Sequence, residues 1–279
     1  MTRFRGPAIL LTVMAIAATA TLAQRYYERR YDRGGIPSWS VDKEFAHDVF
    51  TFVRIRYSSG YGGRGYRGGY GRGGGGWATD YPDSDLNFSY RLHQLTSMEV
   101  NPEPLVLELT DPELVDYPFI YLLEPGRLVF SAAEVEALRS YLLNGGFLMV
   151  DDFWGEEEWD NFYQEIKRVF PDREPQELEL DHEIFRIVFQ LKEKPQIPSI
   201  DWALRGRAYG ITWEREDARE VHYKALYDDK GRMMAIVCHN TDLGDGWERE
   251  GENEWYFHEF SEKKAYPLGI NIVVYAMTH

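Results

Sequence analysis

The sequence has very little cysteine. Its single Cys238 ends the apolar run 233–238 and has no second cysteine in the chain to pair with, which excludes an internal disulfide. A catalytic thiol needs a base and an exposed turn, whereas a cysteine that ends an apolar strand is typically a small core residue. We therefore expect Cys238 in the core and stability that comes from packing.

Long apolar runs are missing beyond the N-terminus. The run at residues 8–23 follows Arg3 and Arg5 and ends with Thr21 and Ala23 at the −3 and −1 positions of a cleavage site. This pattern predicts a signal peptide, residues 1–23, and a periplasmic or secreted protein. The alternative is a retained N-terminal anchor, although an anchor usually needs about 20 apolar residues.

Basic residues are scarce in most of the chain. After Ala23 there are 29 Lys and Arg against 46 Asp and Glu, and residues 77–279 hold 19 against 41, a net charge of −22. Proteins that bind duplex nucleic acid need basic faces. The charge therefore argues against nucleic acid and favours a soluble protein with neutral or cationic partners.

Composition divides the remaining chain. Residues 24–47 read as a flexible lead with a helical turn at 42–47, and residues 48–279 as one α/β domain. The Gly/Arg/Tyr-rich stretch 59–76 cannot form a packed core, and we expect a disordered insertion. Such sequences also bind single-stranded nucleic acid, but this one has only three arginines. The alternatives are peripheral contact with lipid head groups or anionic envelope polymer, and a plain solvated insertion.

Strand and helix patterns alternate from residue 50 onward. Ser131 and Glu134 predict a capping box, followed by a helix with one apolar face that stops at Asn144-Gly145-Gly146. With apolar runs at 117–123 and 147–150 on either side, this predicts a right-handed parallel crossover. The remaining expected elements are strands at 50–57, 105–109, 184–189, 208–213, 222–227 and 233–238, and helices at 86–95, 157–170 and 268–277. The fold class is thus α/β, an open, mainly parallel sheet flanked by helices, with a strand-rich C-terminal part.

Several stretches resemble a bacterial domain-of-unknown-function family of exported or membrane-associated proteins. They are residues 117–121, 131–148 with Asp151-Asp152, 181–185, 195–198 and 269–271, and the likeness covers about 48–279 without the glycine-rich insertion. The resemblance implies a fold similar to class I glutamine amidotransferases and trehalose-utilisation-type proteins, which are flavodoxin-like. Those amidotransferases carry a nucleophilic cysteine on a sharp turn after the strand that is 147–150 here. This chain has Asp151-Asp152-Phe153-Trp154-Gly155 instead, so no acyl-enzyme can form by the usual route.

Asp151 and Asp152 are the main candidates for chemistry. Ligands of open parallel sheets bind at the carboxyl ends of strands, and successive residues leaving a strand point in opposite directions. We expect one of the two to face a crevice and the other to cap the next helix. Together with residues 156–158 they offer carboxylate oxygens to a divalent cation. The alternative is an N-cap with acidic first-turn residues, and no other cofactor is expected.

His182 and His239 are the other candidates. With Asp151 or Asp152 they could form a general acid/base or metal site, although no close spacing ties them together, and a structural role is the alternative. Exposed tryptophans could stack on sugar rings, while a large core explains most of them. The tryptophans concerned are Trp154, Trp159, Trp202, Trp213, Trp247 and Trp255.

Two short acidic groups lack the twelve-residue calcium-loop pattern. They are Asp80, Asp83 and Asp85, and Asp242 with Asp245. We expect Asp85 to be a helix N-cap and residues 248–254 to form a solvated loop.

The missing nucleophile favours a non-catalytic envelope protein that binds an envelope protein or glycan through a strand-end crevice. The alternative is a carboxylate- or metal-dependent hydrolase acting on carbohydrate, with Asp151, Asp152, His182 or His239 at its centre. The sequence leaves the oligomeric state undefined.

Overall fold

The computed structural model describes residues 35–42, 44, 48–58 and 76–279. The expected signal peptide, most of the lead and residues 59–75 of the insertion lie outside them. Within the described part, no helix combines the length and the apolar character needed to cross a bilayer.

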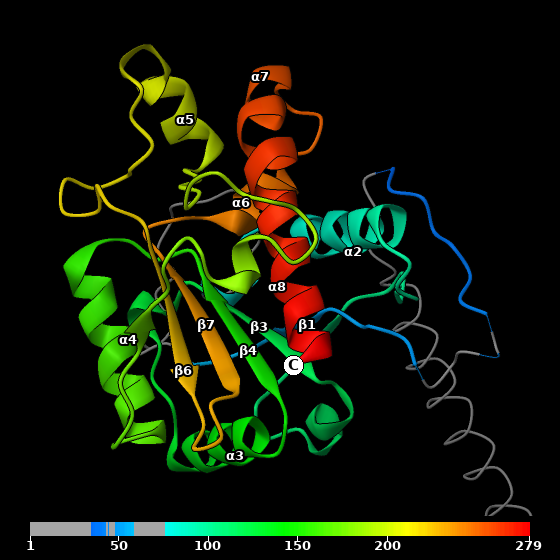
Figure 1. Ribbon diagram of the computed structural model, residues 1–279, viewed down its shortest axis with the longest axis vertical. Helices are drawn as coiled ribbons and strands as arrows, with labels where there is room; N and C mark the ends of the chain where they lie inside the picture. The colour runs from blue at the N-terminus through cyan, green and yellow to red at the C-terminus, as the bar shows by residue number, and fades with distance from the viewer. Residues whose placement is uncertain (1–34, 43, 45–47, 59–75) are drawn as a thin grey trace, which may run out of the picture. The chain divides into compact units, whose positions relative to one another are not determined.

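A seven-stranded sheet forms the centre of residues 36–279 (Figure 1). Its strands are β1 (Val53–Ile55), β2 (Leu105–Leu107), β3 (Phe119–Leu123), β4 (Phe147–Asp151), β5 (Gln176–Glu177), β6 (His222–Tyr227) and β7 (Met233–His239). The order is β2-β1-β3-β4-β7-β6-β5; the first five are parallel neighbours, and β6 and β5 are antiparallel. This is an open, mainly parallel sheet that begins with the flavodoxin-like order 2-1-3-4, which confirms the expected α/β fold class.

Helices cover both faces of the sheet. The α-helices and the π-helix of the described residues are α2 (Asp83–Leu95), α3 (Ala132–Leu143), α4 (Gly155–Val169), α5 (Ile200–Gly206), α6 (Leu243–Glu248), α7 (Glu254–Tyr256), η7 (Phe257–Ala265) and α8 (Tyr266–Thr278), of which α5 and α7 lie beyond the strand ends (Figure 1). The core on one face joins side chains of α2, α6 and α8 to Phe52, Tyr121 and Met149 of the strand region. The core on the other face joins α3 and α4 to Ile55, Leu122 and Val150. Residues that alternate along a strand therefore belong to opposite layers.

The helix after β3 confirms its sequence signals. Ser131 accepts a hydrogen bond from the Glu134 amide, and the Glu134 carboxylate accepts one from the Ser131 amide, which completes the capping box. The helix then buries the predicted apolar face and leads into β4, which runs parallel to β3. Cys238 is buried in the core, as expected.

Two of the four strands expected in the C-terminal part do not form. Residues 183–185 make a 3₁₀ turn, and the amides of Val188 and Phe189 donate to Asn271 Oδ1 on α8 at 3.2 and 2.8 Å instead of to a strand. The run at 208–213 begins in a 3₁₀ turn, Arg207–Tyr209, which is followed by Gly210 at φ 66°. Apolar composition was the only signal for these strands, and the structure gives their backbones other partners.

Candidate functional site

Five carboxylates meet at the carboxyl ends of the parallel strands. Asp80 lies between β1 and α2, Asp152 follows β4, and Asp242, Asp245 and Glu248 follow β7. In two groups that share Asp80, with Asp152 and Asp242 or with Asp245 and Glu248, one oxygen from each residue lies within 4.8 Å of the others. We call these five residues the acidic cluster.

Local backbone geometry aims these side chains. Asp80 and Asp152 have left-handed backbone angles, φ 60° and 55°, which turn the chain sharply just before α2 and just after β4. Asp242 caps α6 by accepting a hydrogen bond from the Asp245 amide at 2.7 Å. The first turn of α6 has Gly244 where Asp80 approaches, since a Cβ at that position would lie 2.7 Å from Asp80 Oδ2.

Burial and mutual repulsion disfavour the charged forms of these carboxylates. Burial, and then the neighbouring acids, raise the pKa of Asp80, Asp152 and Asp242 well above the usual range of aspartate. Burial also raises the pKa of Glu248 to about 7, although Arg249 lies 2.7 Å away. Asp80 Oδ2 is closed off from solvent and accepts no hydrogen bond from any described residue. Protons or a cation must therefore balance the cluster.

Asp151, the last residue of β4, and Asp152 have different partners, and those of Asp151 differ from what the sequence predicted. Asp152 joins the cluster, whereas Asp151 Oδ2 accepts hydrogen bonds from the amides of Leu243 and Gly244 at 2.9 and 3.1 Å. Asp151 thus caps α6, and the prediction that one of the two caps the next helix, α4, is wrong. The first amides of α4 donate to Asn240 and Asp217 instead.

A buried ion pair fixes the segment that carries Asp80. Arg54 is fully buried and donates to Asp85 Oδ2 at 3.0 Å and to the carbonyls of Trp77 and Thr79 at 3.0 and 2.9 Å. Asp85 lies inside α2, so its expected role as an N-cap is wrong. It neutralises Arg54, and Arg54 holds the chain just before Asp80.

The two candidate histidines lie apart from the cluster. His239 is buried between Phe153 and Trp159 on the α4 side of the sheet, with Nε2 3.1 Å from the Gly155 carbonyl, and burial lowers its pKa to about 4. His182 accepts the Ile184 amide and packs on Tyr275 in the last turns of α8. In Figure 1, α8 runs from the region of α6 towards the opposite ends of the strands. Within the described part of the chain, neither histidine therefore forms a shared acid/base or metal site with Asp151 or Asp152.

The sequence analysis named most of the cluster without joining it. Asp80, Asp242 and Asp245 belonged to two separate acidic groups, and Glu248 to an expected solvated loop. That loop is partly packed, since burial raises the pKa of Glu248 and Glu250 accepts a 2.6 Å hydrogen bond from Tyr266. Position was an available signal for Asp152 and Asp242, because they come soon after the parallel strands β4 and β7. Asp80 gave no such signal, since it lies just before α2.

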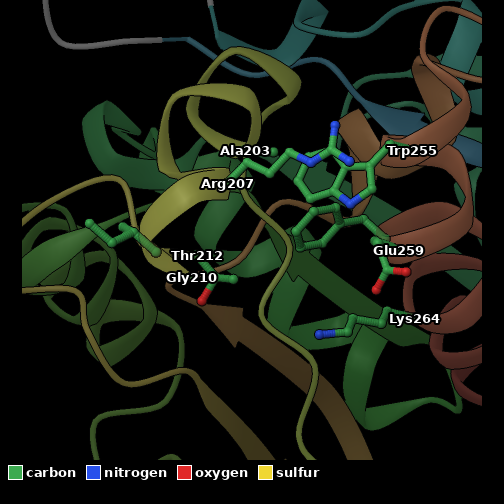
Figure 2. Close-up of a pocket in the computed structure, with 9 residues that line it drawn as sticks. Ala203, Arg207, Gly210, Thr212, Trp255, Glu259 and Lys264 are labelled. Carbon is green, nitrogen blue, oxygen red and sulfur yellow. The ribbon is translucent and has the colours of Figure 1, made fainter.

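A second feature is a cavity of about 200 Å³ between α5 and η7 (Figure 2). The Arg207 guanidinium lies over the Trp255 ring, 4.3 Å from its centre, and Lys264 enters from η7. An adjoining cavity of about 510 Å³ shares Thr212 and Lys264 with it. Neither cavity is lined by the acidic cluster. Trp154 and Trp247 are buried, in keeping with a core role, whereas Trp255 faces this cavity.

Comparison with known proteins places these features in a family. Residues 51–277 match the family described as a domain of unknown function, DUF4159. The chain belongs to the DUF4159 family. A search of curated proteins found no match to the sequence. The DUF4159 match runs from the segment before β1 into α8 and so includes both the acidic cluster and the cavity.

Proposed function

We propose that this DUF4159 protein binds a hard divalent cation in the acidic cluster. The observation that carries the proposal is the convergence of carboxylate oxygens within 4.8 Å of one another. Calcium binds oxygen at about 2.3–2.6 Å, so oxygens on opposite sides of one ion lie roughly that far apart. Carboxylates are also the ligands that calcium and magnesium prefer.

The state of the cluster without a cation supports the proposal. Asp80 Oδ2 has no hydrogen-bond donor among the described residues, and burial, followed by repulsion from the neighbouring acids, raises the pKa of Asp152 and Asp242. A cation would supply the missing partner of Asp80 and neutralise Asp152 and Asp242. It would also fix the first turn of α6 against the turn before α2 and the end of β4.

We further propose that the cation stabilises an exported, non-catalytic protein that binds an envelope protein or glycan. The N-terminal pattern supports export to the periplasm or secretion, which sequencing of the mature N-terminus would test. The strand order and the turn at Asp152 support a relationship with class I glutamine amidotransferase-like folds. The absence of a thiol or hydroxyl from residues 151–155 supports loss of their acyl-transfer chemistry.

Titration of calcium, magnesium and manganese into the chelator-treated protein tests the cation site. We expect binding that Asp80→Asn weakens at least about tenfold, because Asp80 belongs to both carboxylate groups. Asp172→Asn makes the same chemical change at an exposed position and should leave affinity unchanged. Failure of all three ions to bind, or equal loss in both variants, would overturn the proposal.

One observation favours a second candidate, a metal-dependent hydrolase acting on carbohydrate. The two carboxylate groups share Asp80, and two-metal hydrolases hold their ions about 3.5–4 Å apart. An assay against aryl glycosides and oligosaccharides, with and without manganese, separates the candidates. Turnover that requires the metal and disappears in Asp80→Asn would replace the non-catalytic proposal.

A further inference from the structure

The cavity between α5 and η7 is built from two cation–aromatic pairs. Arg207 lies 4.3 Å over Trp255, and Lys264 Nζ lies 5.6 Å from the centre of Phe260. The two rings meet edge to face at 5.7 Å and 87°. Figure 2 shows Arg207 and Lys264 entering the cavity from different elements, with Trp255 beside Arg207. The cavity thus has positive charge from two sides and an aromatic wall.

Part of the positive charge that lines this cavity has no carboxylate partner among the described residues. Arg207 makes no ion pair with a carboxylate of the described part of the chain. Glu259, the acidic residue that lines the cavity, is already paired with Lys263 at 2.7 Å. Lys264 contacts Glu193 at 3.0 Å, but that glutamate is largely exposed and its contact is screened by solvent. In a region of net charge −22, this cavity is a place where an anion meets unbalanced positive charge.

The helix behind the cavity has an unusual geometry. Residues 257–265 form a π-helix, in which the Tyr266 amide donates to the Ser261 carbonyl five residues earlier. Such segments are rare, and those that are found often lie at functional sites. This one supplies Glu259, Phe260 and Lys264 to the lining. Phe260 and Lys264, four residues apart on this segment, contribute an aromatic ring and a cation to the same cavity wall.

We propose that this cavity binds an acidic sugar through the carboxylate of the sugar. A guanidinium that lies over an aromatic ring can still offer two of its N–H groups to a carboxylate in a bidentate hydrogen bond. The Trp255 and Phe260 rings offer apolar surface to the C–H groups of a sugar ring. The adjoining cavity, which shares Thr212 and Lys264, leaves room for further sugar units. This site is separate from the acidic cluster and does not depend on a bound cation.

Calorimetric titration of the purified protein, stripped of metal with EDTA and then dialysed into chelator-free buffer, tests the proposal with three ligands. Trigalacturonate carries three carboxylates on sugar rings, maltotriose is a neutral trisaccharide, and triglutamate carries side-chain carboxylates on a peptide. We expect only trigalacturonate to bind, with an affinity that falls as salt is raised. Quenching of tryptophan fluorescence should report the contact at Trp255.

Matched arginine variants locate the binding. Arg207→Gln should weaken trigalacturonate binding at least about tenfold, as expected for loss of a charge-assisted hydrogen bond. Arg205→Gln removes the exposed arginine that lies 5.8 Å over Trp202, outside the cavity lining, and should leave the affinity within about twofold. Both positions are exposed, and thermal melts check that both variants fold. No binding of trigalacturonate, equal binding of maltotriose, equal or tighter binding of triglutamate, or equal loss in both variants would overturn the proposal.

Discussion

Arg54 and Asp85 show how much depends on a single buried pair. Both side chains are fully buried, and Arg54 satisfies two backbone carbonyls as well as the carboxylate. Removing one partner of such a pair leaves an uncompensated buried charge. The pair therefore serves less to add stability than to hold the chain before Asp80 in one position.

Arg54→Met should lower the free energy of unfolding by about 3–5 kcal/mol, because it leaves the buried Asp85 carboxylate without a counter-charge. Urea unfolding measures the change. Arg56→Met is the matched control, since Arg56 pairs with Glu108 across an exposed surface, with side-chain exposures of 51% and 47%. That variant should lose no more than about 1 kcal/mol. Similar losses in the two variants would contradict the role assigned to burial.

Asp151 and Asp152 are neighbours in sequence with different partners. Asn keeps an oxygen that can accept the amides of Leu243 and Gly244, so Asp151→Asn should retain the cap of α6 and most of the cation affinity. Asp152→Asn removes a charged ligand and should weaken calcium binding at least about tenfold. Isothermal titration of both variants distinguishes them. The reverse order of effects would mean that Asp151 is the ligand.

At the scale of elements, signals that act within one turn were readable from the sequence and long-range pairings were not. The capping box at Ser131 involves residues three apart, so its pattern fixed the start of α3. Residues 184–189 had only apolar composition, and their backbone is satisfied by Asn271 from far along the chain. The acidic cluster was not predicted for the same reason. Its acidic residues could be seen in the sequence, but which of them lie close together depends on the order of the strands in the sheet.

Asn271→Leu should therefore disturb the backbone at residues 188–189, although the two side chains are of similar size. The buried Asn271 side chain accepts two amides and donates to the Phe189 carbonyl at 2.8 Å. Each buried group left without a partner costs about 1–3 kcal/mol. Hydrogen exchange should show the Val188 and Phe189 amides losing protection while β4 amides keep theirs. Unchanged protection at 188 and 189 would show that water replaces Asn271 without cost.

At the scale of the whole molecule, the acidic charge is organised rather than merely abundant. Much of it lies on the surface, but the strand ends gather carboxylates in a place where they cannot all be ionised. Burial raises the pKa of Asp151, Glu124 and Glu248 to about 7. A protein arranged in this way takes up protons on folding, and a cation that binds at the same place must displace protons from its ligands.

This arrangement predicts a dependence of stability on both pH and cation. A carboxyl whose pKa is higher in the folded than in the unfolded state contributes stability that is complete below about pH 4 and is lost as pH rises through about 7. His239, whose pKa is lowered to about 4, acts in the opposite direction, but only below the unfolded value of about 6.5. In EDTA, the melting temperature should therefore fall between pH 6.5 and pH 8.

Calcium should raise the melting temperature more at pH 8 than at pH 6.5, because fewer protons then compete for the carboxylates. Scanning calorimetry of the wild type and of Asp80→Asn tests this, and the calcium effect should be smaller in the variant at both pH values. A calcium effect of equal size at both pH values, or one as large in Asp80→Asn as in the wild type, would place the cation outside the acidic cluster.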